Sequence, residues 1–96
     1  MEKSYIYILT NKSKRVLYIG VTTNLFKRIL EHKEGNGSIF TQIYNLKYLI
    51  YFEEFTDVNQ AISREKQLKN WRKEWKWNLI KDLNPELKAL YEDLKV

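Results

Sequence analysis

The sequence predicts an α+β fold, in which a small three-stranded antiparallel sheet is flanked by helices. Three segments are rich in β-branched and aromatic residues, as strands are, and they lie at residues 5–10, 16–21 and 47–55. Helices are predicted at residues 24–33, 58–70, 71–83 and 86–94. The order β-β-α-β-α-α-α favours helices packed against one antiparallel sheet.

The first two strands are predicted to form a hairpin. Residues 5–10 are apolar or aromatic at both odd and even positions, which suits a strand buried on both faces. Residues 11–15 are polar and predict a turn, after which residues 16–21 supply the second strand. A hairpin of this kind would hold the two segments side by side.

Helix signals follow in order along the chain. Thr23 or Asn24 can cap a helix that runs to about Lys33, and the glycine-containing residues 35–38 end it and open a flexible loop. Beyond the third strand, Asp57 with Gln60 three residues later resembles a capping box. The Asn-Pro pair at 84–85 should end the helix before it, because proline cannot continue a helix.

Composition limits the class of protein. The chain has 96 residues, which is enough for one domain covering residues 1–96, and 44% of them are hydrophobic, which permits a packed core. It has no cysteine, which excludes disulfides and zinc–thiolate sites. We find no signal peptide and no apolar run near the roughly 18 residues that span a bilayer, so we expect a cytoplasmic protein without membrane contact.

The positive charge is concentrated in one segment. Residues 64–81 carry seven basic and two acidic side chains, which accounts for the net charge of +5, while the rest of the chain is balanced. A local basic stretch favours a polyanionic partner, although a solvated helix face has the same composition. Trp71 and Trp75 are four residues apart in this stretch, a spacing that suits either core packing or base stacking.

Glu65 is the residue whose position most needs an explanation. Val58, Ala61, Ile62 and Leu68 form one apolar stripe at helical spacing, and Glu65 falls on that stripe. An unpaired carboxylate on an inward face is costly. Its partner should therefore be a metal ion, an arginine or a tyrosine hydroxyl, and a purely structural ion pair with an arginine is the simpler alternative.

Arg28 and His32 are the second unusual pair. They are four residues apart, so they lie one above the other at the edge of the apolar face of their helix and should point together toward the rim of the sheet. For His32 alone, a favourable interaction with the C-terminal end of the helix dipole is the simpler interpretation.

Taken together, these residues resemble the GIY-YIG nuclease family. The matching blocks occur in the family's order, and they are Tyr5-Ile6-Tyr7, Leu17-Tyr18-Ile19-Gly20, Arg28, Glu31-His32 and Arg64-Glu65. Further matches, such as Phe40-Thr41 and Asn84-Pro85, are similar to the small stand-alone bacterial branch. Two positions depart from the family pattern: Tyr5 replaces the first glycine of the family name, and Val21 stands where some members carry a lysine.

The resemblance implies a hydrolytic site on one face of the sheet. Tyr18 is implied as the general base, Tyr7 as its hydrogen-bonding support, Arg28 as a phosphate ligand and His32 as an aid to proton handling. Glu65 is implied as the single protein ligand of Mg²⁺ or Mn²⁺, which suits an ion that keeps several waters. Asn84 completes the pattern, with Asn78 as the second choice.

The function expected from the resemblance is a metal-dependent endonuclease that hydrolyses phosphodiester bonds of DNA, with DNA repair as its setting. Branched and nicked DNA are candidate substrates, and an accessory protein is a candidate partner. Nonspecific phosphate contacts are expected from the basic helix residues Lys66, Lys69, Arg72, Lys73 and Lys76. Two alternatives stay open: a non-catalytic nucleic-acid-binding module with a vestigial nuclease site, and an interaction domain that uses exposed aromatic residues.

Overall fold

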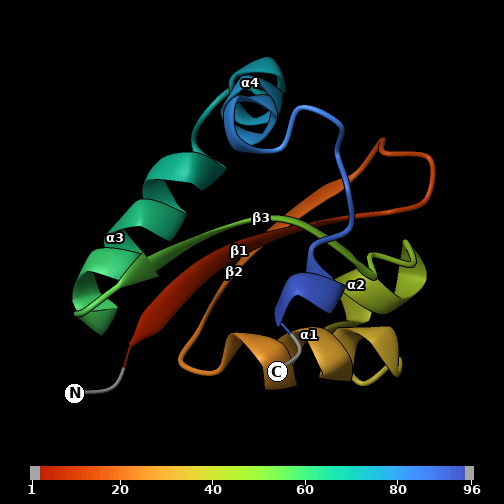
Figure 1. Cartoon of the computed structure of the whole chain (residues 1–96), viewed down its shortest axis with the longest axis horizontal. Coiled ribbons are helices and arrows are strands. Elements are labelled where there is room, and N and C mark those ends of the chain that lie inside the picture. Colours follow the sequence, from red (N-terminus) through yellow and green to blue (C-terminus); the bar gives the residue numbers. More distant parts are fainter. Residues whose placement is uncertain (1–2, 95–96) are drawn as a thin grey trace.

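The sheet has three antiparallel strands with β1 in the middle, in the order β2-β1-β3. A computed structural model describes residues 3–94. In it β1 spans Ser4–Thr10, β2 spans Leu17–Thr22 and β3 spans Tyr48–Phe55. Helices lie on both sides of this sheet (Figure 1). The predicted α+β class and three-stranded antiparallel sheet are confirmed, and the strand ends differ from prediction by about one residue.

Three predicted helices are present. α1 spans Leu25–Lys33 and is capped by Asn24, whose side chain accepts from the Lys27 amide; α3 spans Val58–Lys69 and is capped by Asp57. α4 spans Lys73–Leu83 and begins two residues later than predicted. Within residues 3–94, every helix is too short or too polar to cross a membrane.

Two features differ from the prediction. The expected flexible loop contains a short helix, α2, which spans Ile39–Ile43 and is capped by the Ser38 side chain. The expected helix at 86–94 is wrong, because only a 3-10 turn, η1, forms at Tyr91–Leu94. Leu87 has a left-handed backbone (φ 53°), which interrupts a helix, and the Asn84 side chain binds both the amide and the carbonyl of Lys88.

The sheet separates two apolar layers. On one face Ile6, Ile8 and Ile19 pack against Ala61 and Leu68 of α3 and Ile80 of α4. The other face carries Tyr7, Leu9 and Leu49, which pack against Leu25 and Ile29 of α1 and Tyr91 of η1. Figure 1 shows the same division, with α3 and α4 on one side of the sheet and α1, α2 and η1 on the other.

The two edges of the sheet are treated differently. The segment after α4 lies along β3, where the Asn84 side chain donates to the Ile50 carbonyl and the Leu90 amide to the Leu49 carbonyl. β2 pairs only with β1, so among the described residues its outer edge has no strand partner. The open edge of β2 is therefore the accessible border of the sheet.

Gly20 makes room for the ring of Tyr7. The two residues are opposite each other in the β1–β2 register, and a Cβ on Gly20 would lie 2.4 Å from both Cζ and Oη of Tyr7. Tyr7 is fully buried, so its ring cannot move aside into solvent. The glycine after Tyr18-Ile19 is thus required by packing across the sheet, which is the close approach that a strand glycine permits.

We therefore expect Gly20→Ala to destabilise the fold. Overpacking of this kind costs typically about 1–3 kcal/mol, and urea or thermal unfolding of the variant measures it. Thr23→Ala, an exposed change in the following segment, is the control and should stay within about 0.5 kcal/mol of wild type. An unfolding midpoint for Gly20→Ala equal to that of wild type would contradict this account.

Candidate active site

A buried hydrogen bond joins the sheet to α1. The Tyr7 hydroxyl lies 3.1 Å from Nε2 of His32, and both side chains are buried. The ring centroids of Tyr18 and His32 are 5.8 Å apart, and those of Tyr7 and Tyr18 are 6.2 Å apart. The structure thus brings together Tyr7, Tyr18 and His32, which are separated in sequence.

Thr41 determines which nitrogen of His32 carries the proton. The Thr41 hydroxyl donates to the Ser38 carbonyl at 2.9 Å, so its oxygen must accept the hydrogen bond from Nδ1 of His32, which lies 3.2 Å away. In neutral His32, Nε2 is then the acceptor, and Tyr7 donates its hydroxyl proton to it. The hydroxyl oxygen of Tyr7 remains able to accept a hydrogen bond from the side of Tyr18 and Arg28.

Burial controls the protonation of this pair. Desolvation raises the pKa of Tyr7 to about 12, and the nearby Tyr18 adds to this effect while Arg28 opposes it. Burial also lowers the pKa of His32, with a further lowering from the positive charge of Arg28. At neutral pH, Tyr7 is therefore a neutral phenol and His32 a neutral imidazole.

A small polar hollow opens next to this pair. Its volume is about 260 Å³, and it is lined by Tyr18, Arg28, Glu31, His32, Asn36, Gly37 and Ser38. Tyr18 is half-buried there, whereas Tyr7 lies behind it without exposure. Arg28 pairs with Glu31 at 3.3 Å, but both side chains are more than 40% exposed, so this ion pair is weak and replaceable.

The α2 helix lies next to the hollow, and the residues just before it, Asn36, Gly37 and Ser38, form part of the lining. Phe40 stacks on Tyr18 with ring centroids 6.2 Å apart and an interplanar angle of 29°. Gly37 lies against His32, and a Cβ there would be 2.2 Å from Nδ1. Thr41, Gly37 and Phe40 were not predicted as site residues. The signal that indicates them is the Ser38 cap three residues before Thr41, which marks a helix in the expected loop.

Glu65 lies on the other face of the sheet, on the flank of α3 that is directed toward β2. Ala61 and Leu68 are the buried residues of α3, and Arg64 and Glu65 flank them on opposite sides by helical geometry. Arg64 binds Glu53 of β3 at 2.9 Å. Since the Arg64 flank is directed toward β3, Glu65 is directed toward the open edge of β2.

The predicted inward stripe around Glu65 is partly wrong. Val58 and Ile62 are 42% and 38% exposed, because the buried line of the helix passes through Ala61 and Leu68 instead. Glu65 is half-buried, and its partner is Lys69 at 3.4 Å rather than an arginine or a tyrosine. The described residues contain no group of three possible metal ligands.

Asn84 has a structural position. Its side-chain amide donates to the carbonyls of Ile50 and Lys88 and accepts from the Lys88 amide, so its hydrogen-bonding groups are occupied in holding the segment after α4. Asn78 is exposed on α4. Neither asparagine lines the hollow beside Tyr18, and we assign neither a role in chemistry there.

The basic residues predicted to contact nucleic acid differ in their surroundings. Lys69 pairs with Glu65, and Lys73 donates to the backbone carbonyl of Arg15. Within residues 3–94 the other three, Lys66, Arg72 and Lys76, form no ion pair with a carboxylate. Trp71 packs partly against the core, while Trp75 is exposed, contacts the Trp71 ring edge-on and lies beneath the guanidinium of Arg72.

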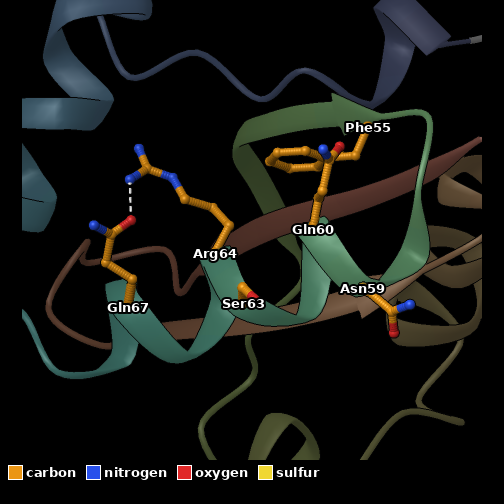
Figure 2. A pocket seen from close by; sticks show the side chains of 6 residues that line it. All are labelled: Phe55, Asn59, Gln60, Ser63, Arg64 and Gln67. Carbon is orange, nitrogen blue, oxygen red and sulfur yellow. Dashed lines mark hydrogen bonds between the residues drawn. The ribbon is translucent and has the colours of Figure 1, made fainter.

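A larger hollow of about 730 Å³ lies along α3, away from the tyrosines. Figure 2 shows its lining, in which the Arg64 side chain is directed toward Gln67. Arg64 also binds the carboxylate of Glu53 in β3, and this ion pair neutralises the charge of the guanidinium. The other lining residues are neutral (Phe55, Asn59, Gln60, Ser63 and Gln67), so this hollow offers no general acid or base and no group to activate the Ser63 hydroxyl.

The chain is similar to known proteins over most of its length. The sequence model of the GIY-YIG catalytic domain matches residues 3–78. The chain belongs to the GIY-YIG family. This is a family of endonucleases that generally use a divalent metal ion and act on DNA.

Relatives share most of their length with this GIY-YIG chain. A UPF0213 protein of Staphylococcus saprophyticus is 35% identical over 85% of this chain and 99% of its own length. One from Clostridium perfringens is 40% identical over 80% of this chain and 82% of its own length. The solution structure of a UPF0213 protein from Bacillus halodurans has a TM-score of 0.59 and 23% identity, with 98% of this chain covered and 99% of that one, which shows a shared fold.

The depressed pKa of His32 predicts a pH-dependent stability. In the unfolded chain the imidazole takes up a proton near pH 6.5, but the folded protein resists this until a lower pH. Stability should therefore fall as the pH drops below about 6.5, by at most about 1.4 kcal/mol per pH unit. Urea unfolding between pH 7.5 and 5.5 measures the effect.

His32→Gln is the control for this measurement, because His32 is the sole histidine of the chain. It should make the unfolding free energy nearly independent of pH across this interval. A wild-type protein that is equally stable at both pH values would show that His32 is not held in its neutral form.

We expect Thr41→Val to destabilise the protein more than Thr41→Ser. Valine leaves the Nδ1 proton of buried His32 without an acceptor, which costs about 1–3 kcal/mol, whereas serine retains the hydroxyl. Chemical unfolding of both variants is the measurement. Equal losses for valine and serine would mean that the methyl group, and not the hydroxyl, accounts for the role of Thr41.

Proposed function

We propose that the protein is a divalent-metal-dependent endonuclease that hydrolyses phosphodiester bonds of DNA at the hollow beside Tyr18. The observation that supports this most is the chain of hydrogen bonds from Thr41 through His32 to Tyr7, directly behind Tyr18 and next to Arg28. A buried polar chain of this kind is costly in free energy, and the rings of Tyr7 and His32 pack against the partly exposed Tyr18.

Tyr18 is the general base in this proposal, and Tyr7 is its support. Tyr7 is unsuited to the role because it is fully buried, its proton is held by His32, and its pKa is raised to about 12. Tyr18 lines the hollow and can meet a water molecule. In the reaction, Tyr18 acts as its phenolate and takes a proton from water while the water oxygen bonds to phosphorus. The bond from phosphorus to the leaving sugar oxygen breaks, and that oxygen takes up a proton from solvent.

Arg28 is the phosphate ligand in this proposal. Its guanidinium lines the same hollow, and its ion pair with Glu31 is exposed to solvent. A phosphate can replace Glu31 because an exposed ion pair contributes only about 0.2–1 kcal/mol, while an arginine can bind a phosphate through two parallel hydrogen bonds. His32 remains neutral and positions Tyr7.

Glu65 would hold the Mg²⁺ or Mn²⁺ ion. One carboxylate is sufficient for such an ion when water and a substrate phosphate supply the other oxygens. The residues fit this role: Glu65 is directed toward the open edge of β2, and its partner Lys69 is exposed and bound by a helix-surface ion pair worth about 0.3–0.5 kcal/mol. The ion, when bound, would neutralise charge on the phosphate and the leaving oxygen.

Replacing Tyr18 by Phe or Glu65 by Ala should abolish cleavage. Removing the base or the metal ligand should slow the reaction at least about 100-fold, as is typical for loss of a general base. The measurement is cleavage of single-stranded, nicked and branched DNA with Mg²⁺ or Mn²⁺. Tyr48→Phe and Glu74→Ala are matched controls that should cut like wild type, because both residues are exposed and distant in sequence from the hollow.

Activity that survives both active-site substitutions would overturn the mechanism. A wild type that binds DNA with a steep salt dependence but cuts none of the substrates with either metal would favour the alternative, a non-catalytic nucleic-acid-binding module. That alternative rests on the basic side chains Lys66, Arg72 and Lys76, which have no carboxylate partner in the described residues.

A further inference from the structure

A second hollow lies at the junction of the hairpin turn and α4. Its volume is about 280 Å³, and it is lined by Arg15, Val16, Leu17, Lys73 and Lys76. Arg15 belongs to the turn between β1 and β2, and the two lysines belong to the first two turns of α4. Two elements far apart in sequence therefore direct three cationic residues to one place, which we call the β2-edge notch.

The charges of the notch are not compensated within the described part of the chain. Neither Arg15 nor Lys73 nor Lys76 forms an ion pair with a carboxylate there. Three like charges around one hollow repel one another, and this repulsion is relieved by a bound anion. The volume is several times the roughly 30 Å³ that a water molecule occupies in the liquid, so a phosphate group can enter.

One hydrogen bond fixes the shape of the notch. The ammonium group of Lys73 donates to the backbone carbonyl of Arg15, which attaches the start of α4 to the hairpin turn. The turn itself is ordered by Asn11, whose side chain accepts from the backbone amides of Arg15 and Val16. The backbone that carries these cationic side chains is therefore ordered by hydrogen bonds.

The notch is next to the proposed site along the open edge of the sheet. Val16 and Leu17 directly precede Tyr18 in β2, and at about 3.3 Å per residue Arg15 lies within about 10 Å of Tyr18 along the strand. β2 has no strand partner on its outer side among the described residues, and Glu65 is directed toward that same edge. A nucleic-acid strand at this edge would meet the notch and the hollow beside Tyr18 in succession.

We propose that the β2-edge notch binds a backbone phosphate of DNA near the scissile phosphate, so that the substrate strand lies along the open edge of β2. This inference rests on the proposed function, since it takes DNA as the polyanion. It assigns a role to Arg15, a turn residue outside the basic helix. It also makes Lys73 and Lys76, and not the whole basic helix, the principal phosphate contacts.

The test is the salt dependence of DNA binding, measured by fluorescence anisotropy with a labelled oligonucleotide. The protein carries Tyr18→Phe, and EDTA replaces the metal, so no cleavage occurs. Loss of one phosphate contact should reduce the slope of log K against log salt by about 0.9 for a duplex and about 0.7 for a single strand. We expect this for Arg15→Gln and for Lys76→Gln, and no larger change for the double variant, because both side chains contact the same phosphate.

Lys81→Gln is the matched control. It removes the same charge from the same helix, but Lys81 is exposed and does not line the notch, so the slope should stay at the wild-type value. The double variant Arg15→Lys/Lys76→Arg conserves the charge and should also bind like wild type. If Lys81→Gln reduced the slope as much as Arg15→Gln and Lys76→Gln, the charge would act diffusely and the notch would be refuted.

Failure of the notch and failure of the nuclease proposal give different results. If the wild type with metal cuts no DNA but Arg15→Gln and Lys76→Gln still reduce the slope, phosphate binding in the notch is supported and the proposed nuclease activity is refuted. If the wild type cuts DNA while both variants keep the full slope, the nuclease activity is supported and phosphate binding in the notch is refuted. Far-UV circular dichroism and unfolding midpoints check that each variant is folded.

Discussion

The hydroxyl of Tyr7 is the constraint on which the site depends. It is buried in an apolar layer, where a hydroxyl without a hydrogen-bond partner would cost about 1–3 kcal/mol. His32 satisfies it, and His32 must in turn be oriented, which Thr41 does. The need to satisfy one buried hydroxyl therefore links β1 to α1 through His32, and α1 to α2 through Thr41.

Small residues complete the same arrangement. Gly20 gives the Tyr7 ring its place in the sheet, and Gly37 lets the loop before α2 lie against His32. A side chain at either position would displace one member of the Tyr7–His32–Thr41 chain. The segment Tyr18-Ile19-Gly20, which matches the family motif, thus combines a partly exposed tyrosine, the proposed general base, with a packing requirement beneath it.

Much of the fold could be predicted from the sequence, because strand and helix patterns are local. The hairpin, the third strand and α1 with Arg28 and His32 on one side follow from periodicity and caps. α2 was missed since its five residues give too short a pattern, although Ser38 marks its start. The final helix was wrong because the Asn84 side chain binds the backbone of Lys88, a preference that periodicity does not contain.

Some of the candidate site could be predicted from the sequence and some could not. Residues on neighbouring strands and one helix edge, such as Tyr7, Tyr18 and His32, could be placed together from topology. The direction of Glu65 could not be predicted, because it depends on how α3 is rotated over the sheet. The ion pair between Arg64 and Glu53 of β3 sets that rotation. The junction of Arg15 with Lys73 is a tertiary contact across 58 residues, for which the sequence contains no local signal.

The position of Tyr91 has a consequence for synthesis of the chain. Tyr91 stacks on Phe26 of α1, with ring centroids 5.3 Å apart, in the same apolar layer as Tyr7. A ribosome releases the N-terminal strands and α1 before residue 91, so the layer under the tyrosines stays incomplete until η1 has also left the ribosome. In a nascent chain, the half of the molecule that bears the candidate site therefore closes only after η1 has been made.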